Sequence, residues 1–144
     1  MFNYFRPRPG RFGTQLVLLT SGRVNTGTLA AGTQTHTIGG LPRKAIISGI
    51  TVSAETWPTA ATSCTVTLVK RDASAAADVT LSSAVDVNDQ TDGTAIIGAL
   101  LTTLTDKERL LDTNDTLKVS LVTTGSVTVQ PDDIVITVEL MVLN

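Results

Sequence analysis

The side chains that could act as nucleophile, general base or soft metal ligand are few, because the chain holds one histidine, His36, and one cysteine, Cys64. A Ser-His-Asp or Cys-His system would have to use His36, and no nucleophile-elbow sequence accompanies it. A zinc site of histidine and cysteine ligands needs more of both. We therefore expect no enzyme, no cofactor and no metal, and we place His36 at a surface or an interface. Cys64 shares strand parity with Val66 and Leu68, which predicts a buried, inert thiol.

The segment Asp86–Gly93 is the most ligand-like part of the chain, because it is rich in the oxygen donors that calcium prefers. It does not fit an EF-hand loop in any register, since no glycine and distal glutamate fall at the required offsets. We predict a polar turn here. A calcium site within Asp86–Asp92 remains the alternative.

Aromatic and basic residues collect at the N-terminus. Of the five aromatic residues, only Trp57 lies beyond the first twelve positions. Every charged residue up to Lys44 is basic, whereas all thirteen acidic residues follow it. Pro7 and Pro9 remove two backbone donors and favour extended geometry around them. Residues 1–15 are therefore expected to form an extended arm.

We expect the arm to dock onto an acidic protein surface, with rings as anchors and arginines as bidentate partners of carboxylates. Nucleic-acid binding is a weaker interpretation, because the arginines are few and the rest of the chain is acidic. A purely solvating tail is a third, against which the rings argue. The predicted partner-binding residues are Phe2, Tyr4, Phe5, Arg6, Arg8, Arg11 and Phe12. Trp57, which precedes Pro58 in a predicted turn, is either an exposed contact point or a cap on the end of the fold.

The elements that must carry these residues are typical of an all-β protein. Apolar and polar residues alternate with a period of two in several short runs, most strongly in Ile134–Val142, and turn-forming residues separate the runs. This favours an antiparallel β-sandwich that is jelly-roll-like. We place the sandwich at residues 41–144, behind an extended arm and lead-in segment at residues 1–40.

Three stretches need separate predictions. Residues 15–20 are expected to form a short strand, and residues 21–40 form either an extended surface segment or an edge strand. Residues 96–104 are expected to be a strand. The capping-box sequence Thr105-Asp106-Lys107-Glu108 predicts a helical turn through Leu111. No apolar run is long enough for a membrane span or a secretory signal, so we expect no membrane partner and assembly in a cytoplasm.

The threonine-, valine- and alanine-rich strands over about Ala45–Leu143 resemble the small capsid decoration (cement) proteins of tailed bacteriophages. Asn114–Leu121, Thr123-Thr124-Gly125 and Ile134–Leu143 carry most of the likeness. The resemblance implies a β-sandwich, a homo-oligomer that is often a trimer, and a position on an icosahedral shell with the arm reaching onto neighbouring capsid proteins. It implies no catalytic residues.

We therefore expect a structural virion protein that is assembled in the host cytoplasm and binds no nucleic acid. Its expected partner is the major capsid protein, and its expected role is to stabilise the outside of the shell. The alternative is a carbohydrate- or surface-binding β-sandwich module of a phage fibre or an adhesin. The lack of aromatic stacking platforms in the body of the chain counts against that alternative.

Overall fold

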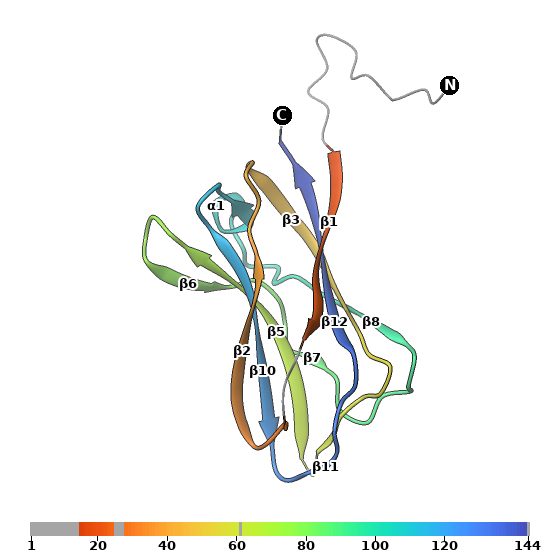
Figure 1. Cartoon of the computed structure of the whole chain (residues 1–144). Helices are drawn as coiled ribbons and strands as arrows, with labels where there is room; N and C mark the ends of the chain where they lie inside the picture. The colour runs from red at the N-terminus through yellow and green to blue at the C-terminus, as the bar shows by residue number, and fades with distance from the viewer. Residues whose placement is uncertain (1–14, 25–27, 61, 144) are drawn as a thin grey trace, which may run out of the picture.

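Two antiparallel sheets pack face to face in the computed structural model, which describes residues 15–24, 28–60 and 62–143 (Figure 1). The first sheet has the strand order β1-β12-β3-β8, with β9 also paired to β3. The second has the order β2-β10-β5-β6, with β7 also paired to β5, and β11 and β4 form a separate two-stranded ribbon. No helix in the described ranges is long and apolar enough to cross a membrane.

The strands and the single short helix of the described ranges follow one another in chain order. They are β1 (Gln15–Val24), β2 (Gly32–Gly39), β3 (Ala45–Ser53), β4 (Thr59–Ala60), β5 (Ser63–Asp72), β6 (Ala77–Thr80), β7 (Val85–Asp86), β8 (Ala95–Gly98), α1 (Asp106–Arg109), β9 (Leu110–Leu111), β10 (Thr116–Thr124), β11 (Val127–Val129) and β12 (Ile134–Val142).

The two large sheets have the connectivity of a jelly roll. β6 and β7 are pieces of one interrupted strand along β5, because the N–H groups of Leu81 and Val87 also donate to β5 carbonyls. With β6 and β7 taken as one strand and the short β4, β9 and β11 left out, eight strands remain, which are counted here from 1 to 8 in chain order. In that count the first sheet has the strand order 1-8-3-6 and the second has the order 2-7-4-5, as in a jelly roll. The predicted all-β, jelly-roll-like sandwich is confirmed.

The core lies between the sheets and is built from aliphatic side chains. Alternation buries every second residue of β5 from Cys64 to Lys70 and of β12 from Ile134 to Val142. Each fully buried leucine, valine or isoleucine contributes about 1.5–3 kcal/mol relative to an exposed one. Since Trp57 is the one aromatic residue after position 12, these aliphatic side chains supply nearly all of the apolar burial.

The sandwich begins earlier than the predicted boundary at residue 40, which is a correction to the domain limits. β1 pairs with β12 from Gln15↔Val142 to Val24↔Ile134, and β2 pairs with β10 at the edge of the other sheet. The strand expected at residues 15–20 is present and longer, and the edge-strand alternative holds for residues 32–39. β2 is rich in glycine and threonine and shows little apolar alternation, so its sequence does not mark it as part of the sandwich.

The region after β7 follows the sequence predictions in part. β8 covers only the first half of the strand expected at residues 96–104, and Leu100 adds an isolated bridge to Ser82. The capping box is confirmed, because the Thr105 hydroxyl accepts from the Glu108 N–H while the Glu108 carboxylate accepts from the Thr105 N–H. The helix ends at Arg109, before the expected Leu111, since residues 110 and 111 pair with β3.

Gly98 lies where β8 passes close to buried side chains. A Cβ atom at Gly98 would lie 2.6 Å from Val85 Cγ2 and 2.7 Å from Ile50 Cγ2. Both neighbours are β-branched and buried, so they have few other rotamers to adopt. We expect Gly98→Ala to lower the free energy of unfolding by about 1–3 kcal/mol, measured by denaturant titration. Gly49→Ala in the adjacent strand is the control, because its Cβ would come no closer than 3.8 Å to Glu139 Cβ; an equal loss there would contradict the steric explanation.

Candidate functional site

The residues predicted to bind a partner through the arm lie outside the described residues. They are Phe2, Tyr4, Phe5, Arg6, Arg8, Arg11 and Phe12. Their docking role therefore stays a prediction. What is described is their point of attachment, since β1 starts at Gln15 opposite Val142, where β12 ends.

Trp57 lies in the core and is only 2% exposed. Its Nε1 donates to the Thr91 carbonyl at 2.9 Å, and its backbone N–H donates to Asp92 Oδ1 at 2.9 Å. The ring therefore closes the sandwich against the loop before β8. This geometry agrees with the prediction that Trp57 caps the end of the fold. The alternative prediction, that Trp57 is an exposed contact point, is wrong.

The oxygen-rich segment Asp86–Gly93 uses its side chains to hold loops together. Asn88 Oδ1 accepts from the Ala60 N–H at 2.7 Å, and Asp86 Oδ1 accepts from the Asn88 N–H at 3.0 Å. Asp92 is bonded to the Trp57 backbone, as described above. No group of three or more histidine, cysteine or acidic side chains is placed to hold a metal ion within the described ranges.

His36 and Cys64 lie on inward-facing positions of different strands. Cys64 is fully buried in β5, as predicted, and burial raises the pKa of its thiol. His36 is half-buried on β2 opposite Val119, and burial lowers its pKa. Among the described residues the buried Nε2 of His36 has no hydrogen-bond partner. Because β5 and β2 lie on either side of β10, the thiol and the imidazole are separated by a strand.

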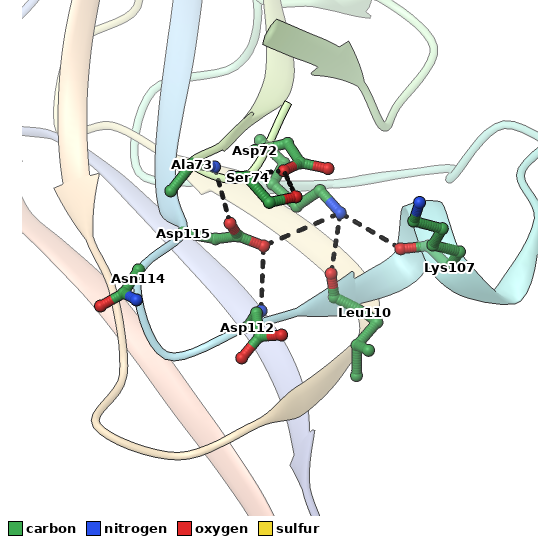
Figure 2. Close-up of a pocket in the computed structure, with 9 residues that line it drawn as sticks. Asp72, Ala73, Ser74, Lys107, Leu110, Asp112, Asn114 and Asp115 are labelled. Atoms are coloured by element: carbon green, nitrogen blue, oxygen red, sulfur yellow. Dashed lines mark hydrogen bonds and ion pairs between the residues drawn. The ribbon is translucent and has the colours of Figure 1, made fainter. Parts of the chain in front are cut away.

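A polar pocket of about 280 Å³ lies beside α1, where β5 ends and β10 begins (Figure 2). Its walls come from the turn after β5, from the segment around α1 and β9, and from the turn before β10. The residues that give it its character are Lys70, Asp72, Lys107, Leu110, Asp112 and Asp115.

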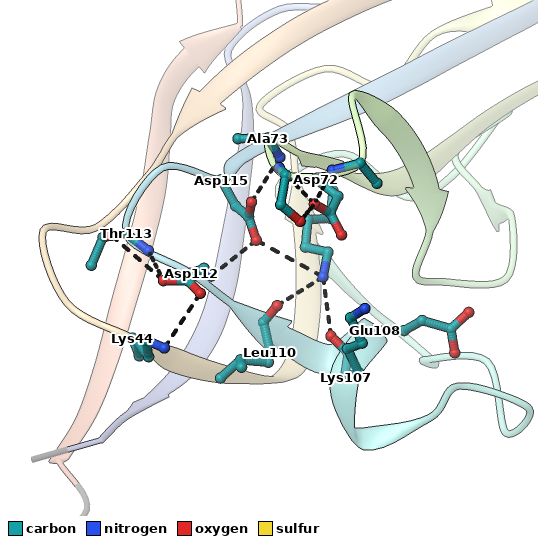
Figure 3. Close-up of polar contacts among 12 residues, drawn as sticks. Lys44, Asp72, Ala73, Lys107, Glu108, Leu110, Asp112, Thr113 and Asp115 are labelled. Carbon is teal, nitrogen blue, oxygen red and sulfur yellow. Dashed lines mark hydrogen bonds and ion pairs between the residues drawn. The ribbon is translucent and has the colours of Figure 1, made fainter.

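The pocket is organised around the ammonium group of Lys70, whose side chain is 2% exposed. Lys70 Nζ donates to the carbonyls of Leu110 at 2.8 Å and Lys107 at 3.2 Å, and Asp115 Oδ2 lies 3.9 Å away (Figure 3). The two carbonyl contacts are the shorter ones. A buried charge survives in a protein when such partners replace its water, so the arrangement ties β5 to the segment from α1 to β9.

The Asp115 carboxylate extends the same network to two further turns. Its Oδ1 accepts from the Ala73 N–H at 2.9 Å, and its Oδ2 accepts from the Asp112 N–H at 3.0 Å. All the acceptor and donor groups at the centre of the pocket thus have partners within the chain. No histidine or cysteine lines it. The arrangement is a structural polar cluster that joins β5, the segment from α1 to β9 and the turn before β10.

The sequence does contain a signal for the burial of Lys70. Lys70 has the same parity as Cys64, Val66 and Leu68, which places it on the buried face of β5. Asp115 could not be found in this way, because it lies in a turn, where parity says nothing about burial.

Four carboxyl groups on the surface near this end of the sandwich have lowered pKa values because they accept hydrogen bonds. They are Asp72, Asp78, Glu108 and Asp112, and their strongest donors are in turn the Ser74 hydroxyl, Lys118 Nζ, the Thr105 N–H and the Thr113 N–H. With each folded pKa below its ordinary value of 3.8 or 4.5, the unfolded chain binds more protons in acid. Their contribution to stability is therefore present above those values and is lost as the pH falls towards the folded ones.

We expect these four carboxyl groups to make the urea midpoint fall as the pH drops through and below the ordinary carboxyl range. Glu108→Gln keeps a side chain that can complete the capping box but does not titrate. Its midpoint should therefore fall less steeply between about pH 4.5 and 3 than that of the unaltered protein. Identical profiles for the two proteins would show that this carboxylate does not contribute. The measurement is circular dichroism at fixed ionic strength.

Comparison with known proteins gives few matches. No protein-family model matches the chain, and no curated protein matches it. Among solved structures, the chain is similar to one described as the capsid of Ralstonia phage GP4, with 17% sequence identity and a TM-score of 0.49. The similarity covers 98% of this chain and 91% of that chain.

Proposed function

We propose that the protein is a structural component of a phage particle that binds the outside of the icosahedral shell and stabilises it. In this proposal the major capsid protein is the partner, and the N-terminal arm is the docking element. The sequence resemblance to decoration proteins supports the proposal. The jelly roll is also compatible with it, because this fold recurs in viral capsid domains, although a fold alone does not define a function.

The observation that carries the proposal is the division of the chain into a folded sandwich, whose polar pocket is satisfied internally, and a chemically different arm. At the polar pocket, Lys70 and Asp115 are satisfied within the body. The segment before Gln15 holds three arginines, four aromatic rings and no acidic residue, and it joins the sandwich beside the end of β12. Rings and arginines are the residue types that dominate protein–protein interfaces.

The length of the arm suits contact with a surface beyond the body. Residues 1–14 would span about 50 Å if they were fully extended. Several arms in one oligomer would strengthen binding through multivalency, even if each arm bound weakly. An acidic surface on the shell would complement Arg6, Arg8 and Arg11.

The alternative of a carbohydrate-binding module retains support from the fold, since jelly rolls also occur in lectin domains. Sugar sites commonly use an exposed aromatic ring. The described part of the chain has Trp57 as its one aromatic residue, and that ring is buried. The burial of the Trp57 ring therefore favours shell binding over carbohydrate binding.

The proposal is tested by mixing the purified protein with shells assembled without it and sedimenting them. We expect the protein to pellet with the shells in a saturable manner and to raise the temperature at which they come apart. The same preparation applied to a glycan array should show no binding. Binding to glycans without co-sedimentation would replace the proposal with the alternative.

A further inference from the structure

β1 forms one edge of the first sheet, and no strand in the described ranges pairs with its outer side. It runs for ten residues, and its first charged residue is Arg23. The opposite edge, β8, has four residues, and the β2 edge is polar, with exposed threonines between Gly32 and Gly39. Natural sheets protect their edges with charges, prolines, bulges or short strands. Over residues 15–20 β1 has none of these.

Both faces of β1 carry apolar side chains that the sandwich covers incompletely. Leu16 and Leu18 point outward and are 60% and 61% exposed. Val17 and Leu19 point inward, pack against the core and are half-buried. A further strand paired with the free edge of β1 would contact all four of these side chains. It would also form hydrogen bonds with the backbone N–H and C=O groups of β1 that point away from β12.

The outer face next to β1 is nearly free of charge. Leu16 lies opposite Met141 of β12, which in turn lies opposite Ile46 of β3. Within β12 and β3 the one charged residue is Glu139, which lies opposite Leu18 and accepts a hydrogen bond from Ser48. A partner at this edge therefore meets an apolar, uncharged strand.

We infer that β1 pairs with β1 of a second copy of this chain, antiparallel and across a two-fold axis at Val17. In that register Leu16 of each copy lies beside Leu18 of the other, and the two first sheets become one continuous sheet. A two-fold contact places the same surface against itself, so it requires a segment without like-charge repulsion. Residues 15–22 meet this requirement because they carry no charge.

Other occupants of the edge fit less well. The arm of the same chain contains Pro7 and Pro9, which lack the N–H groups that a regular ladder needs. A strongly charged strand would find no countercharge along residues 15–22. A second copy supplies what the edge lacks, namely another uncharged apolar strand of equal length.

The inference does not depend on the proposed shell binding. A contact closed by a two-fold axis gives a dimer, whereas the resemblance to decoration proteins implies a trimer. The molar mass of the free protein therefore tests the inference, and its failure would leave shell binding untouched.

The experiment is light scattering coupled to size-exclusion chromatography, over a wide range of concentration. We expect a dimer for the unaltered protein. Leu18→Glu and Leu16→Lys should each raise the dimer dissociation constant roughly tenfold or more, because each places a charge without a countercharge against a leucine of the other copy, and Glu139 lies opposite position 18. Mixing the two variants should restore dimers, since the new carboxylate of one then lies beside the new ammonium of the other.

Ile97→Lys is the matched control, because Ile97 lies on β8 at the far edge of the same sheet and is 83% exposed. It should leave the dimer intact. Circular dichroism checks that each variant keeps its β-sheet spectrum, which we expect since Leu16 and Leu18 are already largely exposed. A monomer or a trimer for the unaltered protein, or a mixture that stays monomeric, would overturn the inference.

Discussion

Replacement of Asp115 by alanine is expected to lower the free energy of unfolding by about 3 kcal/mol, at the lower end of the range for breaking a buried ion pair. Asp115 is 5% exposed, and the loss of its carboxylate leaves the N–H groups of Ala73 and Asp112 without their acceptor. It also removes the carboxylate that lies 3.9 Å from Nζ of the buried Lys70. The loss should not reach the upper end of the range, because Lys70 keeps the carbonyls of Lys107 and Leu110.

A double-mutant cycle separates the charge from the hydrogen bonds. In a Lys70→Met background no buried ammonium is left, so Asp115→Ala should cost clearly less than it does in the unaltered protein. Denaturant unfolding followed by circular dichroism gives the four free energies. If Asp115→Ala costs the same in both backgrounds, then the carboxylate acts only through the two backbone donors.

Trp57→Ala is expected to cost about 3–5 kcal/mol, because it empties a large, almost fully buried site. The loop before β8 should loosen with it, since Trp57 Nε1 holds the Thr91 carbonyl. Hydrogen exchange of the backbone amides of residues 88–94 reports this loosening directly. Unfolding by urea gives the total cost.

Trp57→Phe is the matched variant for this prediction. It keeps an aromatic ring but cannot donate to Thr91, so it should cost less than the alanine variant. If both substitutions left stability unchanged, the ring would not be part of the core. If phenylalanine cost as much as alanine, the hydrogen bond to Thr91 would outweigh the packing.

The sandwich was predictable where one face of a strand is buried. In β5 and β12 strict alternation marks the inward residues, and the same parity that identified Cys64 also placed Lys70 inside. The capping box before α1 was predictable as well, because Thr105 and Glu108 interact over only three residues. Such features are local in sequence, and period or spacing therefore determines them.

The remaining features depend on contacts between distant residues. The sequence left β2 as either an edge strand or an extended surface segment, because its glycines and threonines carry no apolar pattern, and its pairing with β10 decides for the edge strand. The burial of Trp57 depends on Thr91 and Asp92, some 34 residues away. The polar pocket joins Lys70 at the end of β5 to Asp115 in the turn before β10, with β6, β7, β8, α1 and β9 between them in the chain. No spacing rule relates a strand residue to a turn that far along the chain.

The most direct test of the account is whether phage shells retain a protein that lacks residues 1–14. The truncation starts at the first residue of β1 and so keeps the whole described sandwich. We predict that the truncated protein folds and gives the β-sheet circular dichroism spectrum of the described sandwich. We also predict that it does not co-sediment with the shells above background. Full-length Ile97→Lys, altered only on the body, should bind as the unaltered protein does. Binding of the truncated protein to shells at full occupancy would contradict the central claim that the arm is the docking element.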